Sequence, residues 1–239
     1  FSEDHFITAT KDGQIVGWPG TPEDPSFLQR AAKTDALYTG LALVDVPPAS
    51  SRVLLAPDFH GGTLDIYGPS YEALVFREKA TGIPEDFAPF NVVPIGDQIY
   101  VTYAKQNANK TDSVPGRGNG YVSVFSFTLA PPTEKILVAR GELDSPWAVA
   151  LAPSSFGALA GTLLVGNFGD GAIHAYDPNS GALVGQLTTA GGDPLHIPGL
   201  WDLKAGPGGT TDLSQTLFFT AGPSNEAHGV LGKLEATPN

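Results

Sequence analysis

Short apolar runs recur along the chain, and loops rich in Gly, Pro, Asn or Asp separate them. Apolar residues spaced every 3.6 positions, as on one face of a helix, do not persist over any useful length. Short apolar runs bounded by turn-forming residues are typical of β-strands. The pattern therefore predicts an all-β protein.

Five of these runs begin at a glycine and share one pattern. They are GQIVGW from Gly13, GTLDIY from Gly62, GYVSVF from Gly120, GAIHAY from Gly171 and GVLGKL from Gly229. The second residue after the glycine is always aliphatic, and the fifth is aromatic in four of the five copies. The glycines lie 49, 58, 51 and 58 residues apart. A repeat of this length is typical of propeller blades or solenoid units.

Each complete copy is the third of four apolar runs. Around Gly62, for example, LYTGLALV and RVLLAP precede the copy and EALVF follows it. Four short strands joined by turns predict an antiparallel blade, and such blades around an axis form a propeller. A solenoid fits less well, because its units usually have fewer strands or include helices.

Strand counting predicts that the chain, 1–239, forms a single β-propeller domain and supplies about four and a half blades. The expected segments are a partial blade at 1–35, blades at 36–80, 87–140 and 144–190, and a partial last blade at 197–239. The first segment lacks an innermost strand and the last lacks an outermost one, which would leave bare sheet edges. We therefore expect residues before Phe1 in the native protein. As the N-terminal remainder of the propeller, in this chain or a separate one, they are the first expected partner.

Composition narrows the function. The net charge is −12, and the 13 Lys and Arg residues do not cluster, so nucleic acid is not expected as a partner. The chain has no cysteine, which excludes disulfides, thiolate metal sites and a cysteine nucleophile. No apolar stretch approaches the length of a membrane span.

Several segments together resemble an uncharacterised family of mostly bacterial, exported proteins with NHL-like propeller repeats. They are DFHGGTLDIY, FAPFNVVPIGDQIYVTYAKQ, GNGYVSVF, SPWAVALAP, LLVGNFGDGAIHAYDPNSG, GLWDL and FTAGPSNEAHGVLG. The resemblance covers nearly the whole chain, with the motifs in order. It implies six blades, about one and a half of them before Phe1, and a secreted or extracytoplasmic location, but no established reaction. Ala148 and Asp202 depart from it, since the family usually has Gly there.

One face of the propeller is expected to hold the binding groups. In a propeller the loop between the second and third strands and the loop between blades open on the same face. Loops held by a rigid scaffold commonly carry binding groups, and aromatic residues ringed by polar ones commonly line small-molecule sites. The binding candidates in these loops and the adjoining strands are Asp58, His60, Lys105, Trp147, Asn167, Asp170, Trp201, Glu226 and His228.

Some of these residues also have a purely structural explanation. Asp170 and Asn119 each precede a glycine at a hairpin turn, where Asp and Asn are favoured without any ligand. Trp147 and Trp201 would pack between blades. His174 alternates with apolar residues on a third strand and is expected to be a structural partner between blades.

Two short motifs add candidate chemistry. In Asp58-Phe59-His60 and in Glu226-Ala227-His228 a carboxylate lies two residues from an imidazole, so His60 and His228 are the catalytic candidates. Ca²⁺ or Mg²⁺ would prefer oxygen ligands. Asn91 and Asp202, on strands expected to line the channel, are the metal candidates, although they could simply bind channel water. The oxygens of Asp58, Asn167 and Glu226 complete the expected oxygen set.

Two functions follow from these residues. The first is an exported propeller scaffold that binds a small molecule or a protein through the loop-rich face. The alternative is a hydrolase or lactonase that depends on a divalent cation at the propeller axis. The loop 103–120 is the longest insertion and would act as a lid, and its Asn109 lies in an N-glycosylation sequon that would be used in a secreted eukaryotic protein.

Overall fold

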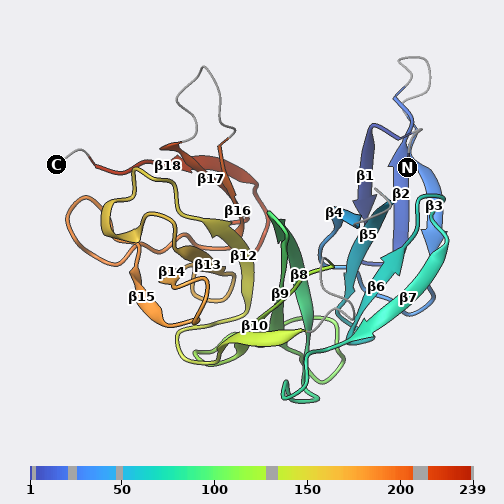
Figure 1. The fold of residues 1–239 in the computed structure, drawn as a ribbon, viewed down its shortest axis with the longest axis horizontal. Helices are drawn as coiled ribbons and strands as arrows, with labels where there is room; N and C mark the ends of the chain where they lie inside the picture. The colour runs from blue at the N-terminus through green and yellow to red at the C-terminus, as the bar shows by residue number, and fades with distance from the viewer. Residues whose placement is uncertain (2–3, 21–25, 47–50, 128–133, 207–214, 238–239) are drawn as a thin grey trace. The chain divides into compact units, whose positions relative to one another are not determined.

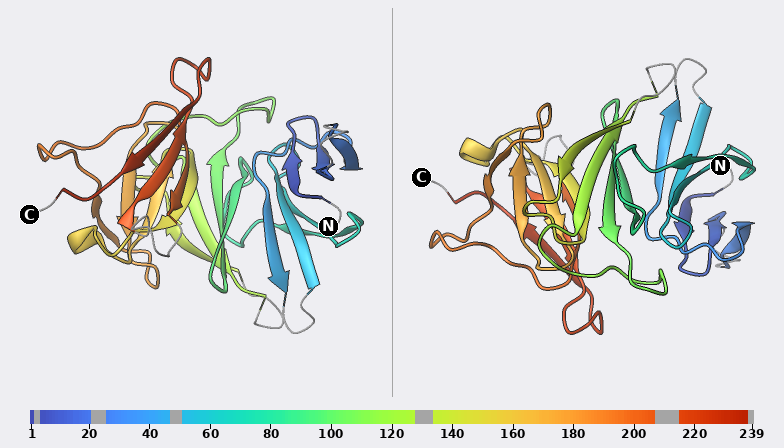
Figure 2. Two further views of the ribbon diagram at one scale, coloured as in Figure 1. Left: turned by 90° about the horizontal axis from the view of Figure 1, so that it is seen from above. Right: turned by 90° about the horizontal axis from the view of Figure 1, so that it is seen from below.

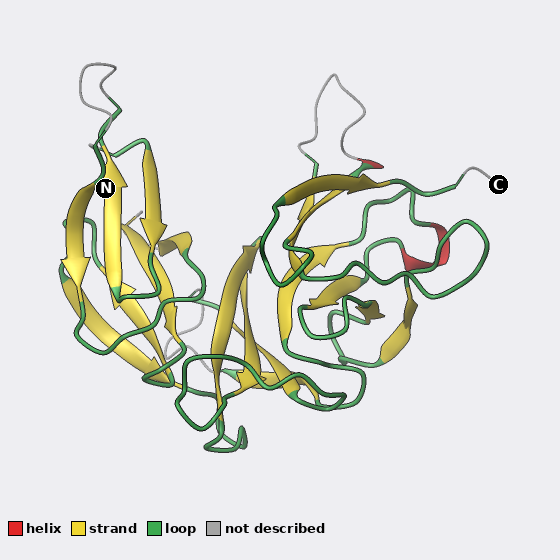
Figure 3. Ribbon diagram, turned by 180° about the vertical axis from the view of Figure 1, so that it is seen from behind, coloured by secondary structure: helices red, strands yellow, loops and turns green. Residues whose placement is uncertain are grey.

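The protein is built from β-strands and loops (Figure 3). The computed structural model describes residues 1, 4–20, 26–46, 51–127, 134–206 and 215–237. Within these residues lie 18 strands and one named 3₁₀ helix, Gly157–Leu159. The all-β class predicted from the spacing of apolar runs is confirmed.

The strands form five sheets, in which every pair of defined register is antiparallel (Figure 1). The first sheet has the order β1-β2-β3, with β1 (Phe6–Ala9), β2 (Gln14–Trp18) and β3 (Leu28–Ala32). The second has the order β4-β5-β6-β7, with β4 (Ala42–Val46), β5 (Ser51–Asp58), β6 (Thr63–Tyr67) and β7 (Ala73–Glu78). The third has the order β11-β10-β9-β8, with β8 (Phe87–Ile95), β9 (Gln98–Lys105), β10 (Gly120–Phe125) and β11 (Lys135–Ala139).

The last two sheets follow the same plan. The fourth has the order β12-β13-β14-β15, with β12 (Pro146–Leu151), β13 (Leu163–Asn167), β14 (Ile173–Tyr176) and β15 (Leu183–Gln186). The fifth has the order β16-β17-β18, with β16 (Leu200–Ala205), β17 (Leu217–Ala221) and β18 (Val230–Leu234). The strands can be followed from two further sides in Figure 2.

The blades have four antiparallel strands in three sheets and three strands in the other two, in the part of the chain that the structure describes. The propeller fold with four-stranded blades is thus confirmed. The blade count is corrected: the chain folds into five blades, instead of contributing four and a half blades to a ring of six. The first and last sheets each form a blade of their own, although each has one strand fewer.

The chain divides into two compact units. The first unit is Phe1–Ser113 with Ser123–Ile136, and the second unit is Val114–Val122 with Leu137–Asn239. The β4–β7 blade lies wholly in the first unit and the β12–β15 blade wholly in the second.

The backbone explains why two of the repeats begin with glycine. Gly13 and Gly171 have φ angles of 79° and 73°, which disfavour any residue with a side chain. A Cβ at Gly171 would lie 2.3 Å from the carbonyl oxygen of Ile197, because the next loop packs directly against it. The Gly171 carbonyl accepts a hydrogen bond from the Ile197 N–H at 2.9 Å, and Gly13 accepts one from Lys33 at 2.9 Å. At Gly13 and Gly171 the repeat therefore marks where the turn is tied to the following loop.

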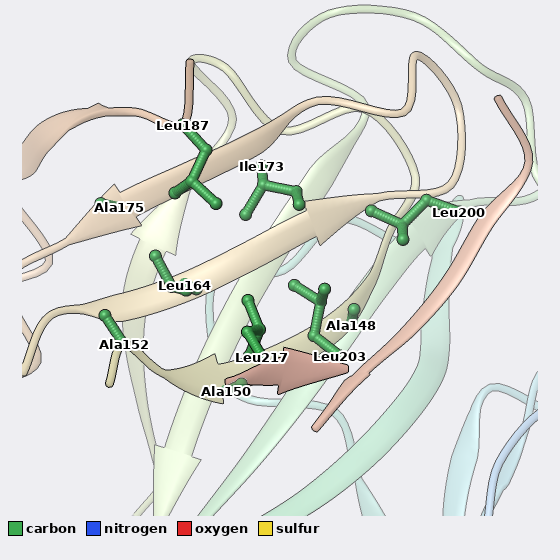
Figure 4. Packing of buried hydrophobic residues seen from close by; sticks show 10 residues of the cluster. All are labelled: Ala148, Ala150, Ala152, Leu164, Ile173, Ala175, Leu187, Leu200, Leu203 and Leu217. Atoms are coloured by element: carbon green, nitrogen blue, oxygen red, sulfur yellow. The ribbon is translucent and has the colours of Figure 1, made fainter. Parts of the chain in front are cut away.

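Each unit has its own apolar core. In the second unit, the alternate residues Ile173 and Ala175 of β14 pack with Leu164, Leu200 and Leu203 (Figure 4). In the first unit the core includes Ile15, Leu54 and Ala56, with the rings of Tyr38 and Tyr67. Because successive residues of a strand point to opposite faces, the other face of each third strand is available for polar groups.

The innermost strands carry β-bulges. The register shifts between Pro89 and Asn91 in β8, and between Leu200 and Leu203 in β16. A bulge bends the strand and re-aims its side chains. The structure contains no helix long and apolar enough to cross a membrane, within the described residues.

Candidate functional site

In the second unit the loops at one end are tied to one another. The Phe168 N–H donates to the Ser145 carbonyl at 3.0 Å, and Ala172 forms a β-bridge with His196. The Gly222 N–H donates to the Gly199 carbonyl at 2.8 Å. These bonds link the loops that carry Asn167, Asp170 and Glu226 to the neighbouring loops within this unit.

The first unit has a corresponding set of loops. The Phe59 N–H donates to the Leu37 carbonyl at 2.8 Å, and the Gln106 N–H donates to the Asp86 carbonyl at 2.8 Å. The Gln106 side chain also donates to the Phe59 carbonyl. The loops that carry Asp58, His60 and Lys105 therefore lie together within this unit.

Asp58 fixes its own loop. Its carboxylate is 1% exposed, and Oδ1 accepts the backbone N–H groups of Leu37 at 3.0 Å and Gly61 at 2.8 Å. Oδ2 lies 2.9 Å from Lys33 Nζ. Oδ1 thus bonds to the backbone and Oδ2 is held only by the ion pair with Lys33, so the carboxylate does not orient the imidazole of His60, which is half-buried. The expected Asp58–His60 pair does not form.

Lys33 connects two buried carboxylates. Besides Asp58, its Nζ contacts Asp65 Oδ2 at 2.8 Å. Asp65 also accepts a hydrogen bond from the Tyr38 hydroxyl at 2.9 Å, and the hydroxyls of Tyr38 and Tyr67 lie 2.6 Å apart. Although burial alone would lower the pKa of Lys33, its hydrogen bonds to Asp65 and Asp58 raise it above the usual value. Lys33 is therefore held as a cation by this network, which sequence analysis missed.

The side chains of Asn91 and Asp202 stabilise the β-bulges of their strands. Asn91 Oδ1 accepts the N–H of Val92 at 2.8 Å, and Asp202 Oδ1 accepts the N–H of Leu203 at 2.8 Å. An Asp or Asn side chain that bonds to the next N–H stabilises an irregular backbone. Burial raises the pKa of Asp202 above its usual range. Both proposed metal ligands therefore have a local structural role.

Asn167 is fully buried at the end of β13. Its Nδ2 donates to the Glu142 carbonyl at 2.8 Å, whereas its Oδ1 has no hydrogen-bond partner among the described residues. Asp170 is exposed, and its Oδ1 accepts the N–H of Ala172 at 2.9 Å, which is the hairpin-turn role that its position before Gly171 suggested.

His174 and Tyr176 extend this set along β14. Both side chains are buried, and neither His174 Nδ1 nor the Tyr176 hydroxyl has a hydrogen-bond partner in the described part of the chain. Burial lowers the pKa of His174, although the charges of Asp170 and Glu142 oppose this shift. His174 is thus buried on the third strand with Nδ1 unpaired among the described residues, and its expected role as a structural partner between blades stays a prediction. The sequence signal was a polar residue between apolar ones, which does not reveal whether it is satisfied.

The half-buried Trp201 and the exposed Glu226 form a pair. The indole Nε1 donates to Glu226 Oε1 at 3.2 Å. The loop that carries Glu226 has positive φ angles at Ser224, Asn225 and Glu226, at 57°, 54° and 62°. The flat ring of Trp201 lies against Gly222, where a Cβ would be 2.4 Å from Cζ2. Three consecutive non-glycine residues in this conformation are costly, and such strain is common at ligand sites.

The remaining candidates are placed as follows. His228 is exposed on the loop before β18, and Trp147 is half-buried on β12. Lys105 Nζ lies 3.4 Å from Asp86 Oδ2. Asn109 is exposed in a loop that is closed by the hydrogen bond from the Lys110 N–H to the Asn107 carbonyl at 3.0 Å.

The described residues contain no group of three or more His, Cys, Asp or Glu side chains placed to hold a metal ion. Of the expected oxygen ligands, those of Asp58, Asn91 and Asp202 are already used by backbone N–H groups. The free oxygen of Asn167 and the exposed carboxylate of Glu226 remain.

The chain is similar to viral proteins of larger size. It is 34% identical over 239 residues to the uncharacterized protein R648 of Acanthamoeba polyphaga mimivirus, covering 96% of this chain and 56% of that protein. It is 32% identical over 207 residues to the uncharacterized protein R640 of the same virus, covering 82% of this chain and 37% of that protein. The chain thus spans about half, or less, of the curated relatives it matches. No family model matches it.

Solved structures resemble it in fold. The α-L-arabinanase of Penicillium chrysogenum, complexed with arabinobiose, has a TM-score of 0.59 and 12% identity, over 96% of this chain and 70% of that one. A gluconolactonase from Xanthomonas campestris has a TM-score of 0.53 and 17% identity, over 91% of this chain and 79% of that one. At these identities the likeness shows the fold alone. What these comparisons establish for this chain is a β-propeller fold.

Proposed function

We propose that this chain is part of a propeller that binds a ligand through the loops of its second unit, with Trp201 and Glu226 at the centre of the site. The observation that carries this proposal is the contact between the indole of Trp201 on β16 and the carboxylate of Glu226 on an exposed loop, 3.2 Å apart. A half-buried aromatic side chain beside a polar group is a common composition of a binding site.

The backbone around this pair supports a binding role. The left-handed conformation of Ser224, Asn225 and Glu226 costs on the order of 1 kcal/mol per residue. A loop with no role beyond connecting β17 to β18 would adopt cheaper angles. The strain here holds the Glu226 carboxylate against the indole and so fixes the direction of its second oxygen.

The charge of the pair also supports binding. Glu226 is exposed, and among the described residues its carboxylate contacts only the neutral indole N–H and no cation. Its negative charge and its second oxygen are therefore available to hydroxyl, amide or ammonium groups of a ligand. The nearby His228 is exposed on the same loop and adds a further donor or acceptor.

The test uses the three Trp side chains of the chain as reporters. Their indole N–H signals are assigned by NMR with the variants Trp18→Phe, Trp147→Phe and Trp201→Phe, and the protein is titrated with a library of water-soluble neutral, anionic and cationic fragments. We expect fragments that shift the Trp201 signal and lose affinity about tenfold or more in Glu226→Gln, because a bond to a charged group contributes about 1.5–3 kcal/mol. If no fragment shifts Trp201, or if Glu226→Gln has no effect, the proposal is wrong.

A hydrolase or lactonase that depends on Ca²⁺ or Mg²⁺ is the second candidate. The likeness of the fold to a gluconolactonase favours it, although only at the level of fold. Within the second unit His228 would be the base, with Asn167 and Glu226 as the oxygen ligands that are not used by backbone N–H groups. The other candidate base, His60, lies in the first unit. Hydrolysis of gluconolactone in the presence of Ca²⁺, abolished by a chelator and by His228→Gln, would support this candidate over simple binding.

Two expectations from the sequence belong to the same proposal: membership of the exported family with NHL-like repeats, and location outside the cytoplasm. We also propose that a further segment acts as a partner of this five-bladed propeller, and the greater length of the viral relatives is compatible with such a segment. Native protein recovered from culture medium, with its intact mass and N-terminal sequence, tests the location and the further segment.

A further inference from the structure

We propose that a pocket in the first unit binds a small neutral ring compound that carries one polar end. The pocket has a volume of about 460 Å³ and lies between β3 and the strands β6 and β7. These strands can be located in Figure 1. It is separate from the loops of the second unit, so this inference does not depend on the proposed function.

The walls of the pocket are mainly apolar. Ala31 and Ala32 come from β3, Ile66 and Tyr67 from β6, and Leu74 from β7. The side chain of Leu74 is 48% exposed at the rim. Burying apolar ligand surface against such walls is favourable by about 25 cal/mol per Å². The pocket therefore favours a compact apolar ring over an extended polar molecule.

The polar groups of the pocket are already paired in charge. Arg30 Nε donates to Asp4 Oδ2 at 2.9 Å, and the Arg30 guanidinium also lies over the Tyr71 ring. Lys33 Nζ contacts Asp65 Oδ2 at 2.8 Å. Lys33 also contacts the buried Asp58, so the network has one more carboxylate than cation, which disfavours an anion. The charged ends of Arg30 and Lys33 line the pocket themselves and disfavour a cation in contact with them. A charged ligand would also have to give up water, which is costly.

The polar end of the ligand has specific neighbours. The Lys33 side chain is 40% exposed, so a ligand hydroxyl or amide can approach its ammonium group from the pocket. The Tyr71 hydroxyl donates to Asp4 and can accept a further hydrogen bond on its oxygen. One hydroxyl on the ligand can accept a hydrogen bond from Lys33 and donate one to the Tyr71 oxygen.

The test compares three probes of the same size: benzyl alcohol, benzoate and benzylammonium. Binding to the whole chain is followed by the amide and side-chain NMR signals of Lys33, Tyr71 and Leu74. We expect benzyl alcohol to bind with a Kd on the order of millimolar, as is normal for a ligand of this size, and the two ions to bind at least tenfold more weakly. If either ion binds as tightly as benzyl alcohol, or if the shifts map to other residues, the proposal is overturned.

A matched pair of variants locates the site. Leu74→Glu places a charge at the rim of the pocket, whereas Val184→Glu makes the same change on β15, where the side chain is also 48% exposed. Because both residues are exposed, both variants are expected to fold. We expect Leu74→Glu to weaken benzyl alcohol binding about tenfold and to favour benzylammonium, with Val184→Glu unchanged. Equal behaviour of the two variants would contradict the proposed location.

Discussion

The β4–β7 blade and the β12–β15 blade use the same polar positions in different ways. Counted from the glycines that start the repeat, three pairs of residues correspond: Asp58 with Asn167, Asp65 with His174, and Tyr67 with Tyr176. In each blade these residues lie at the end of the second strand and on one face of the third strand.

In the β4–β7 blade these groups form a closed network. Lys33 contacts both Asp58 and Asp65, at 2.9 and 2.8 Å. The Tyr67 hydroxyl is paired with that of Tyr38 at 2.6 Å. The loop after β3 supplies the cation, so both carboxylates are paired in charge, and Asp58 Oδ2 is held by this ion pair alone.

In the β12–β15 blade the corresponding groups are left open. Asn167 Oδ1, His174 Nδ1 and the Tyr176 hydroxyl are buried without hydrogen-bond partners in the described residues. The segment that precedes this blade supplies a carbonyl, from Glu142, but no cation that reaches these groups. Buried polar groups are normally satisfied, so this blade carries the less stable arrangement.

The difference shows that the repeat specifies where polar groups are buried, and that the preceding segment decides whether they stabilise the blade. In the β4–β7 blade, the residue of the preceding segment that does this is Lys33. Substitutions at the paired positions should therefore change the free energy of unfolding by unequal and predictable amounts.

Asn167→Asp should have the largest effect. It places a carboxylate at a site with 0% exposure, where the amide now donates to the Glu142 carbonyl. With no cation to compensate it, we expect the free energy of unfolding to fall by about 3 kcal/mol, as measured by urea denaturation. The isosteric change in the other direction, Asp58→Asn, should cost less, because its backbone N–H donors keep an oxygen acceptor. Equal losses would contradict the comparison.

Lys33→Met should be the next most harmful. It leaves Asp58 and Asp65 without their shared cation. Because the Lys33 side chain is 40% exposed, the expected loss is about 2 kcal/mol, below the 3–5 kcal/mol of a fully buried pair. Adding Asp65→Asn to Lys33→Met should recover part of the stability. No recovery in the double variant would show that the network does not act as a unit.

Removing the hydroxyl of Tyr67 or of Tyr176 should give a smaller difference in stability between the two blades. Tyr67→Phe removes a satisfied hydroxyl and should cost about 1 kcal/mol. Tyr176→Phe removes a hydroxyl that has no partner in the described chain, so stability should be unchanged or should rise. The difference between the two midpoints of urea denaturation measures this contrast. A larger loss for Tyr176→Phe would reverse it.

The pH dependence of stability should report on His174. Burial lowers the pKa of its imidazole in the native state below the usual 6.5, with Asp170 and Glu142 opposing the shift and His196 and Arg117 adding to it. The unfolded chain therefore binds this proton at higher pH than the native chain does. The free energy of unfolding should then fall as the pH drops below about 6.5.

Two variants separate this effect from other titrations. His174→Gln removes the buried imidazole, so its stability should fall less between pH 7 and pH 5 than that of the unchanged protein. His196→Gln changes an exposed histidine and serves as the matched control. A pH profile that is the same for all three proteins would contradict the assignment.

The strands and turns could be predicted from the sequence because they depend on local spacing. Gly13 and Gly171 repeat for a backbone reason that operates within a few residues. The partner of Asp58 could not be predicted, since Lys33 lies in the preceding segment and only the fold brings them together. For the same reason, the sequence placed His174 correctly on a third strand and did not reveal that its Nδ1 lacks a hydrogen-bond partner among the described residues.

The candidate site was predicted unevenly. Strand order alone predicts that the loops of Asn167 and Glu226 open together, and hydrogen bonds link each of them to neighbouring loops. Asn91 and Asp202 were predicted as metal ligands because polar residues on inner strands suggested a channel site. Both instead bond to the N–H of the next residue at a bulge, and a single sequence does not reveal a bulge.

The central claim is that this propeller functions by binding and does not require a divalent cation. Elemental analysis of the intact native protein, paired with its thermal unfolding midpoint before and after treatment with a chelator, tests this most directly. We expect no stoichiometric Ca²⁺ or Mg²⁺, and a thermal unfolding midpoint that the chelator does not change. One bound cation per chain, removed by the chelator together with a lower midpoint, would contradict it and favour the hydrolase.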